Sequence, residues 1–121
     1  MSYTINYDQG TETIMVAVHG ELDLQLLQRL ATDVAAAIKR HDCKRILNDL
    51  RNARLTQKSF DIYQMPEEAK KLGIGHSHKR ALVVEDRATD FHFLETVFVN
   101  RGYEVKMFTN PDEALVWLSK D

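Results

Sequence analysis

The first third of the chain begins with alternating polar and apolar residues and then changes to a helical spacing. Tyr3–Asp8 and Thr13–Val18, separated by the turn signal Gln9-Gly10, predict a β-hairpin whose first strand lies at a sheet edge. We expect Gly20-Glu21-Leu22-Asp23 to end the second strand. Asp23 then suits the N-cap of an amphipathic helix. The apolar positions of that helix are Leu27, Leu30, Ala31, Val34 and Ile38.

The rest of the chain alternates short apolar strands with helical patterns. Strands are predicted at 44–50, 80–85 and 103–108, and helical patterns over 56–72, over 86–101 and from Asn110-Pro111 onward. Pro66 falls inside the first of these patterns, so we expect two short helices or a kink there. Pro111 suits the first position of the last helix.

This order of elements needs crossover connections and predicts the α/β class. We expect a mostly parallel central sheet of about five strands, with an antiparallel N-terminal edge strand and about four helices. Residues 1–121 are interpreted as a single domain, because no repeat, linker or low-complexity segment divides them.

Composition narrows the class of protein. The 121 residues are 44% hydrophobic and 28% charged, with a formal net charge of −2, as in ordinary soluble domains. The single cysteine, Cys43, and the short apolar runs indicate a cytoplasmic protein with no membrane span. Residues 39–58 contain seven Lys or Arg against two Asp, but the predicted strand divides them between two ends of the sheet, so nucleic-acid binding is not expected.

A candidate binding rim lies where two predicted strands end. Asp49 and Arg51 lie at the end of one predicted strand, and Glu85 and Asp86 lie at the end of the next. Because ligands of open α/β sheets gather at the carboxyl ends of parallel strands, this mixed-charge rim suits a protein surface or a small polar ligand. The alternative is that strand ends simply meet water there.

Few residues suggest catalysis or metal binding. His76 and His78 share a loop, but no third ligand is evident, so we expect exposed histidines and no metal or other cofactor. The chain has no phosphate-binding glycine loop, no nucleophile elbow and no zinc-protease motif. We therefore predict no catalytic residue, and an enzyme stays the third alternative.

Two family resemblances can be drawn from the motifs. Arg80-Ala-Leu-Val-Val-Glu-Asp-Arg87 looks like the opening of a two-component receiver domain, but Glu85 and Asp86 alone supply too few oxygen ligands for its magnesium site. The second resemblance runs from Ile14 to Leu118. Met15-Val-Ala-Val-His-Gly-Glu-Leu-Asp23, Arg45-Ile-Leu-Asn-Asp-Leu-Arg51 and Asp112-Glu-Ala-Leu-Val-Trp-Leu118 resemble, in order and spacing, the anti-sigma-factor-antagonist (STAS) domains, in the SpoIIAA-like branch also labelled STAS/SEC14.

The STAS resemblance implies a non-catalytic switch that binds a protein partner. In classical members, phosphorylation of a serine or threonine at the start of the helix after the third strand turns the switch off. The matching segment here is Leu55–Phe60, where Ser59 and Thr56 are the candidate hydroxyls. The classical Asp-Ser-Ser-Gly pattern is absent, and the alternative is that Thr56 caps a helix and Ser59 is a solvated first-turn residue.

The SEC14 likeness implies a second class of function, a carrier of a lipid or another apolar small molecule. Six residues are candidates for lining such a pocket, although they serve equally well as ordinary core: Tyr63, Met65, Ile74, Phe91, Phe93 and Phe98. The leading interpretation remains a regulatory module that binds a protein partner through the segment from Asp49 to Ser59 and the following helix. A homodimer is also consistent with the sequence.

Overall fold

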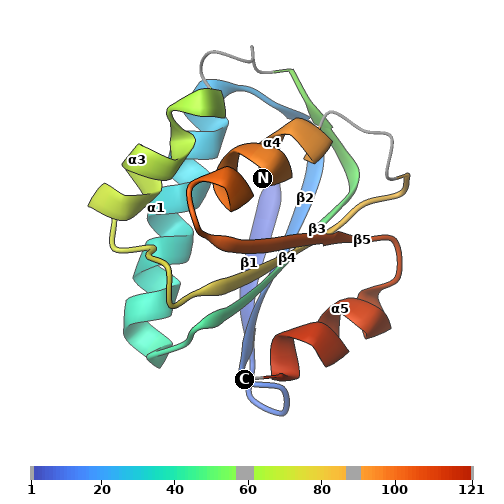
Figure 1. Ribbon diagram of the computed structural model, residues 1–121. Helices are drawn as coiled ribbons and strands as arrows, with labels where there is room; N and C mark the ends of the chain where they lie inside the picture. Colours follow the sequence, from blue (N-terminus) through green and yellow to red (C-terminus); the bar gives the residue numbers. More distant parts are fainter. Residues whose placement is uncertain (1, 57–61, 87–90, 121) are drawn as a thin grey trace.

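A computed structural model describes residues 2–56, 62–86 and 91–120, in which five strands form one sheet (Figure 1). In the order in which they lie side by side, the strands are β1 (Tyr3–Asp8), β2 (Thr13–Leu22), β3 (Arg45–Leu55), β4 (Lys79–Val83) and β5 (Glu104–Phe108). β1 pairs antiparallel with β2, and the other neighbours pair in parallel. The predicted mixed sheet with an antiparallel edge strand is therefore confirmed.

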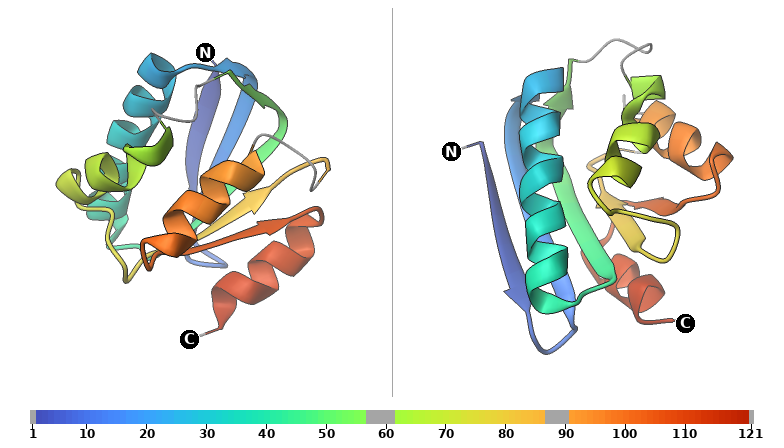
Figure 2. Two further views of the ribbon diagram at one scale, coloured as in Figure 1. Left: turned by 45° about the horizontal axis from the view of Figure 1, so that its top comes forward. Right: turned by 90° about the vertical axis from the view of Figure 1, so that its left-hand side faces the viewer.

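Helices cover the two faces of the sheet unequally. The described elements include α1 (Leu24–His41), α3 (Met65–Lys71), α4 (Phe91–Asn100) and α5 (Pro111–Ser119). Figures 1 and 2 show α1, α3 and α4 on one face and α5 on the other. The larger core cluster accordingly joins α1, α3 and α4 to the sheet. The smaller cluster places Ala114 and Leu118 of α5 against Leu47, Ala81, Val83 and Phe108.

The first helix follows its sequence pattern closely. The carboxylate of Asp23 accepts a hydrogen bond of 2.8 Å from the backbone N–H of Leu26, which satisfies one of the free donors at the helix start. Its apolar stripe faces the sheet, with Leu27, Leu30, Val34 and Ile38 buried. Asn110 likewise caps α5, with Pro111 in the first turn. Both predicted helix starts are confirmed.

Two strands are longer than the sequence predicted. β2 continues to Leu22 instead of ending at Gly20, and β3 continues to Leu55 instead of ending near Leu50. The two strands keep pairing up to Leu22 opposite Leu55, and both of these leucines are buried. Gly20 has a φ of +85°, so it supplies an irregular step inside the strand instead of a stop.

The helical pattern around Pro66 is interrupted as predicted. Ile62 and Tyr63 have helical backbone, Gln64 forms a turn, and α3 starts directly after it. Pro66 lies in the first turn of α3, where its missing N–H would have no intrahelical partner anyway. The break in the helix therefore comes before the proline. Residues 57–61 of the predicted 56–72 pattern lie outside the described residues.

Candidate functional site

Asp49 and Arg51 form a two-pronged ion pair inside β3. Arg51 donates from Nε to Oδ1 of Asp49 at 2.9 Å and from Nη2 to Oδ2 at 2.7 Å. Residues two apart on a strand share a face of the sheet, so the pair forms without any loop. The hydrogen bond from Arg51 lowers the pKa of Asp49, and the same contact raises the pKa of Arg51.

The sequence predicted that the strand ends at this pair, and that predicted strand end was wrong. β3 reaches Leu55, because Leu50 and Leu55 are buried and hold the later part of the strand against the core. In register, Asp49 lies opposite Val83, the last residue of β4. Glu85 and Asp86 follow β4 and are exposed just beyond that level.

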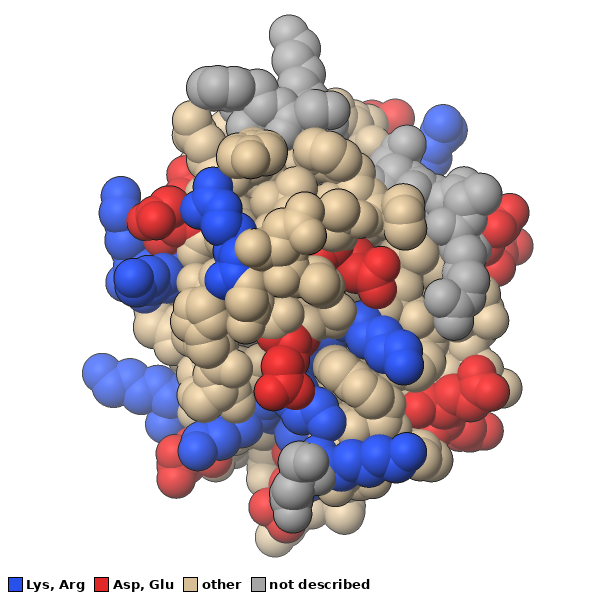
Figure 3. Space-filling model, in the orientation of Figure 1, with Lys and Arg blue, Asp and Glu red and all other residues tan. Residues whose placement is uncertain are grey.

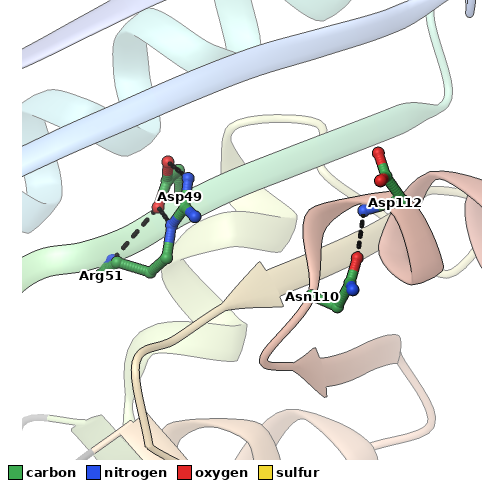
Figure 4. Close-up of polar contacts among 4 residues, drawn as sticks. All are labelled: Asp49, Arg51, Asn110 and Asp112. Atoms are coloured by element: carbon green, nitrogen blue, oxygen red, sulfur yellow. Dashed lines mark hydrogen bonds and ion pairs between the residues drawn. The ribbon is translucent and has the colours of Figure 1, made fainter.

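The ion pair lies on the α5 side of the sheet. Asn110 Oδ1 accepts a hydrogen bond of 2.8 Å from the N–H of Asp112 at the start of α5. Figure 4 shows the ion pair and this capped helix start on the same side of the sheet. The Asp49 carboxylate already has two guanidinium donors, so the arrangement fits an ordered surface element better than a general base.

The candidate switch residues lie after β3. Thr56 is exposed, and its hydroxyl donates a hydrogen bond of 3.0 Å to the carbonyl oxygen of Leu22. Its backbone N–H donates to the same oxygen at 3.0 Å. Thr56 thus fastens the end of β3 to the end of β2, and the N-cap of α3 is Gln64. Ser59 lies outside the described residues.

An exposed aromatic side chain stands just before α3. Tyr63 is 57% exposed. The guanidinium of Arg101, at the end of α4, lies 5.4 Å from the centroid of its ring. Arg101 also donates from Nη2 to the carbonyl oxygen of Tyr63 at 3.5 Å. Tyr63 and Arg101 are far apart in the sequence, yet together they place an aromatic ring and a cation side by side on the surface.

A cleft of about 420 Å³ separates α1 from α3. In Figure 2 the two helices lie beside each other on the same face of the sheet. Of the expected pocket residues, Met65, Ile74 and Phe98 line this cleft. Phe91 belongs to the core, whereas Tyr63 and Phe93 are exposed. Five further apolar lining residues come from α1: Leu24, Leu27, Leu30, Ala31 and Val34.

Arg80 of β4 also lines this cleft and was not among the residues expected from the sequence. Its guanidinium lies 4.2 Å from the centroid of the Phe98 ring and 5.5 Å from that of Tyr103. Burial lowers its pKa to about 10. The only signal in the sequence was an arginine at the start of the most apolar strand.

The loop histidines serve the fold. Nδ1 of His78 accepts a hydrogen bond of 3.0 Å from the N–H of Gly75, and burial lowers the pKa of His78. His76 stacks on Tyr103 with ring centroids 4.2 Å apart. Within the described ranges, no three His, Cys, Asp or Glu side chains form a group able to hold a metal ion.

Surface charge and helix character add two observations. On the face drawn in Figure 3, Lys and Arg side chains are interspersed with Asp and Glu. Among the helices that the structure describes, none combines the length and apolar character needed to cross a bilayer.

Comparison with known proteins identifies the fold. The chain resembles the unphosphorylated anti-sigma factor antagonist SpoIIAA (TM-score 0.59, 13% identity), covering 98% of this chain and 99% of that one. It also resembles an anti-sigma factor antagonist from Mycobacterium paratuberculosis (TM-score 0.63, 15% identity, 98% and 96% covered). A third similar structure is an uncharacterised DUF3478 protein from Shewanella loihica with a SpoIIAA-like fold (TM-score 0.58, 17% identity, 96% and 91% covered).

These likenesses extend over nearly the whole chain, so the SpoIIAA-like fold expected from the sequence is confirmed. No family model matches the chain, and no curated protein does either.

Proposed function

We propose that this chain is a non-enzymatic regulatory module that acts by binding a protein partner. The proposed contacts lie on the segment that leads from β3 to α3, at Arg54, Thr56 and Tyr63, and we call this segment the β3–α3 surface. The fold is one that anti-sigma factor antagonists use. The proposal carries their mode of action, binding to another protein, over to this chain.

The observation that carries the proposal is the exposed ring of Tyr63 beside Arg101. Tyrosine and arginine are over-represented among residues that dominate binding at protein interfaces. A tyrosine has few torsions to fix on binding, and the nearby guanidinium restricts it further. A surface aromatic held in this way loses little entropy when a partner covers it.

Phosphorylation of Thr56 is a way in which partner binding at the β3–α3 surface could be regulated. Phosphorylation of Thr56 would remove the hydroxyl hydrogen that is donated to the carbonyl oxygen of Leu22. It would also add about −1.5 to −2 charge at neutral pH. That charge would lie next in sequence to a segment that contributes the cations Arg51 and Arg54. In this proposal Thr56 and Ser59 remain the candidate phosphorylation sites, and the module works in the cytoplasm.

Affinity capture from host extract with the purified chain as bait tests the proposal. Tyr63→Ala should lose the captured partner, whereas Val116→Ala, which changes an equally exposed apolar residue on α5, should retain it. Both residues are 57% exposed, so the two variants each remove an equally exposed apolar surface and differ in its position. Equal capture by the two variants would contradict a role for the β3–α3 surface.

A further inference from the structure

The α1–α3 cleft is lined mainly by apolar side chains, with Glu68 and Lys71 of α3 among its polar lining residues. It also contains Arg80, whose Nε and Nη2 atoms are buried. Leu27 and Ala31 contribute from α1, and Ala69 contributes from α3. Ile46 and Arg80 come from the sheet beneath. A volume of about 420 Å³ falls within the roughly 300–1,000 Å³ typical of small-molecule pockets.

Arg80 has donors that the fold leaves unused. Its Nε and Nη2 atoms are closed to solvent and have no hydrogen-bond partner in the described part of the chain. Phe98 and Tyr103 stack against the guanidinium, but a ring face does not replace an oxygen acceptor. A buried cation without a counter-charge is costly, so native proteins seldom keep one unless it has a task.

The two unused atoms also indicate which ligand chemistry would satisfy them. Nε and Nη2 form one edge of the guanidinium, and that edge matches the two oxygens of a carboxylate. Arg51 in the same chain uses this edge to hold Asp49, at 2.9 Å and 2.7 Å (Figure 4). Arg80 has the same edge and no carboxylate among the described residues.

We propose that the α1–α3 cleft binds a small amphipathic molecule with one carboxylate, its apolar part against α1 and α3 and its carboxylate on Arg80. Nε and Nη2 are closed to solvent, so binding of the carboxylate requires the guanidinium to turn toward the cleft. The apolar walls exclude water and strengthen the resulting ion pair. This site is separate from the β3–α3 surface and does not depend on the proposed partner.

Decanoate and 1-decanol are suitable probes, because they share a ten-carbon chain and differ in the carboxylate. Calorimetric titration of the delipidated protein, below the concentration at which decanoate forms micelles, gives the two dissociation constants. We expect decanoate to bind at least about tenfold more tightly than 1-decanol, as a charge-assisted hydrogen-bonded pair should provide. Equal affinity for the two probes, or no decanoate binding, would overturn the proposal.

Substitutions locate the site. Arg80→Met should abolish the preference for decanoate, whereas Lys70→Met should keep it, because Lys70 is an exposed cation of α3 that does not line the cleft. Arg80→Gln is the second variant if Arg80→Met does not fold. A preference for decanoate that persists without Arg80 would refute the assignment. Intermolecular NOEs from decanoate to Leu27 and Ala69 are expected, and NOEs confined to other surfaces would also refute it.

Discussion

The guanidinium of Arg80 lies 4.2 Å from the centroid of the Phe98 ring, on the side of the sheet covered by α1, α3 and α4. The contact joins β4 to α4 without any hydrogen bond from Nε or Nη2 of the arginine to a described residue. The rings of Phe98 and Tyr103 therefore lie against a guanidinium whose Nε and Nη2 have no acceptor among the described residues.

This relationship predicts that Arg80 contributes little to stability. Arg80→Met should change the free energy of unfolding by less than about 1 kcal/mol, because the lost cation–π contact is offset by removal of a poorly solvated charge. Phe98→Ala should cost about 3–5 kcal/mol, since it leaves a cavity in the core. Urea unfolding measures both values. A comparable loss in the two variants would show that Arg80 is a structural residue.

The ion pair of β3 makes a prediction about protonation. Arg51→Gln should raise the pKa of Asp49 toward its ordinary value, because the hydrogen bond from Arg51 is the main cause of the lowered pKa. NMR titration of the Asp49 carboxyl carbon measures the shift. Arg54→Gln removes another exposed cation of the same strand and is the matched control. An unchanged Asp49 titration in Arg51→Gln would disprove the assigned cause.

The same pair should contribute only modestly to stability. Asp49 titrates at a lower pH in the folded chain than in the unfolded one, so the stabilisation is fully present above about pH 4 and is lost as the pH falls through the folded-state pKa. The side chain of Arg51 is 43% exposed, so Arg51→Gln should cost no more than about 1 kcal/mol at neutral pH.

His78 should make stability depend on pH in the mildly acidic range. Burial lowers its pKa in the folded state, so the unfolded chain binds the proton more readily. Stability should be constant above about pH 6.5 and should decrease as the pH falls from there through the folded-state pKa. His78→Asn keeps an acceptor for the Gly75 N–H and removes the titration. Urea unfolding across this range should show a weaker pH dependence in the variant, and an identical pH profile would contradict the prediction.

The N-cap of α1 can be tested with two substitutions. Asp23→Ala should lower the free energy of unfolding by about 1 kcal/mol, because the N–H of Leu26 loses its acceptor. Asp23→Asn retains a side-chain oxygen and should stay within a few tenths of a kcal/mol of the original protein. Thermal unfolding compares the three proteins. Equal losses in Asp23→Ala and Asp23→Asn would indicate that the charge, and not the hydrogen bond, is responsible.

The sequence was most informative where local chemistry decides the structure. The 3.6-residue spacing of Leu27, Leu30, Val34 and Ile38 predicted the buried face of α1, since that spacing is set within one helix. The strand ends were harder to predict. Considered alone, Gly20 predicts the end of a strand. In the structure β2 and β3 continue beyond this level, because Leu22 pairs with Leu55.

The cleft could not be predicted from spacing. It is lined by residues of α1, α3 and α4 and of strands β3 and β4, so it depends on how these separate elements pack. Three of the six candidate aromatic and aliphatic residues line it, and three do not, because composition cannot show which way a side chain points. Arg80 lies at the start of a strand, where a charged residue normally reaches water.

Native mass spectrometry of the protein purified from its own host is the most direct test of the proposed binding to a protein partner. We expect an assembly that contains a second protein and that separates into two different chains on denaturation. The denatured chain should carry the mass of one phosphate if Thr56 or Ser59 is used as a switch. A protein recovered only as a single chain, or only as an assembly of identical copies, would contradict the account.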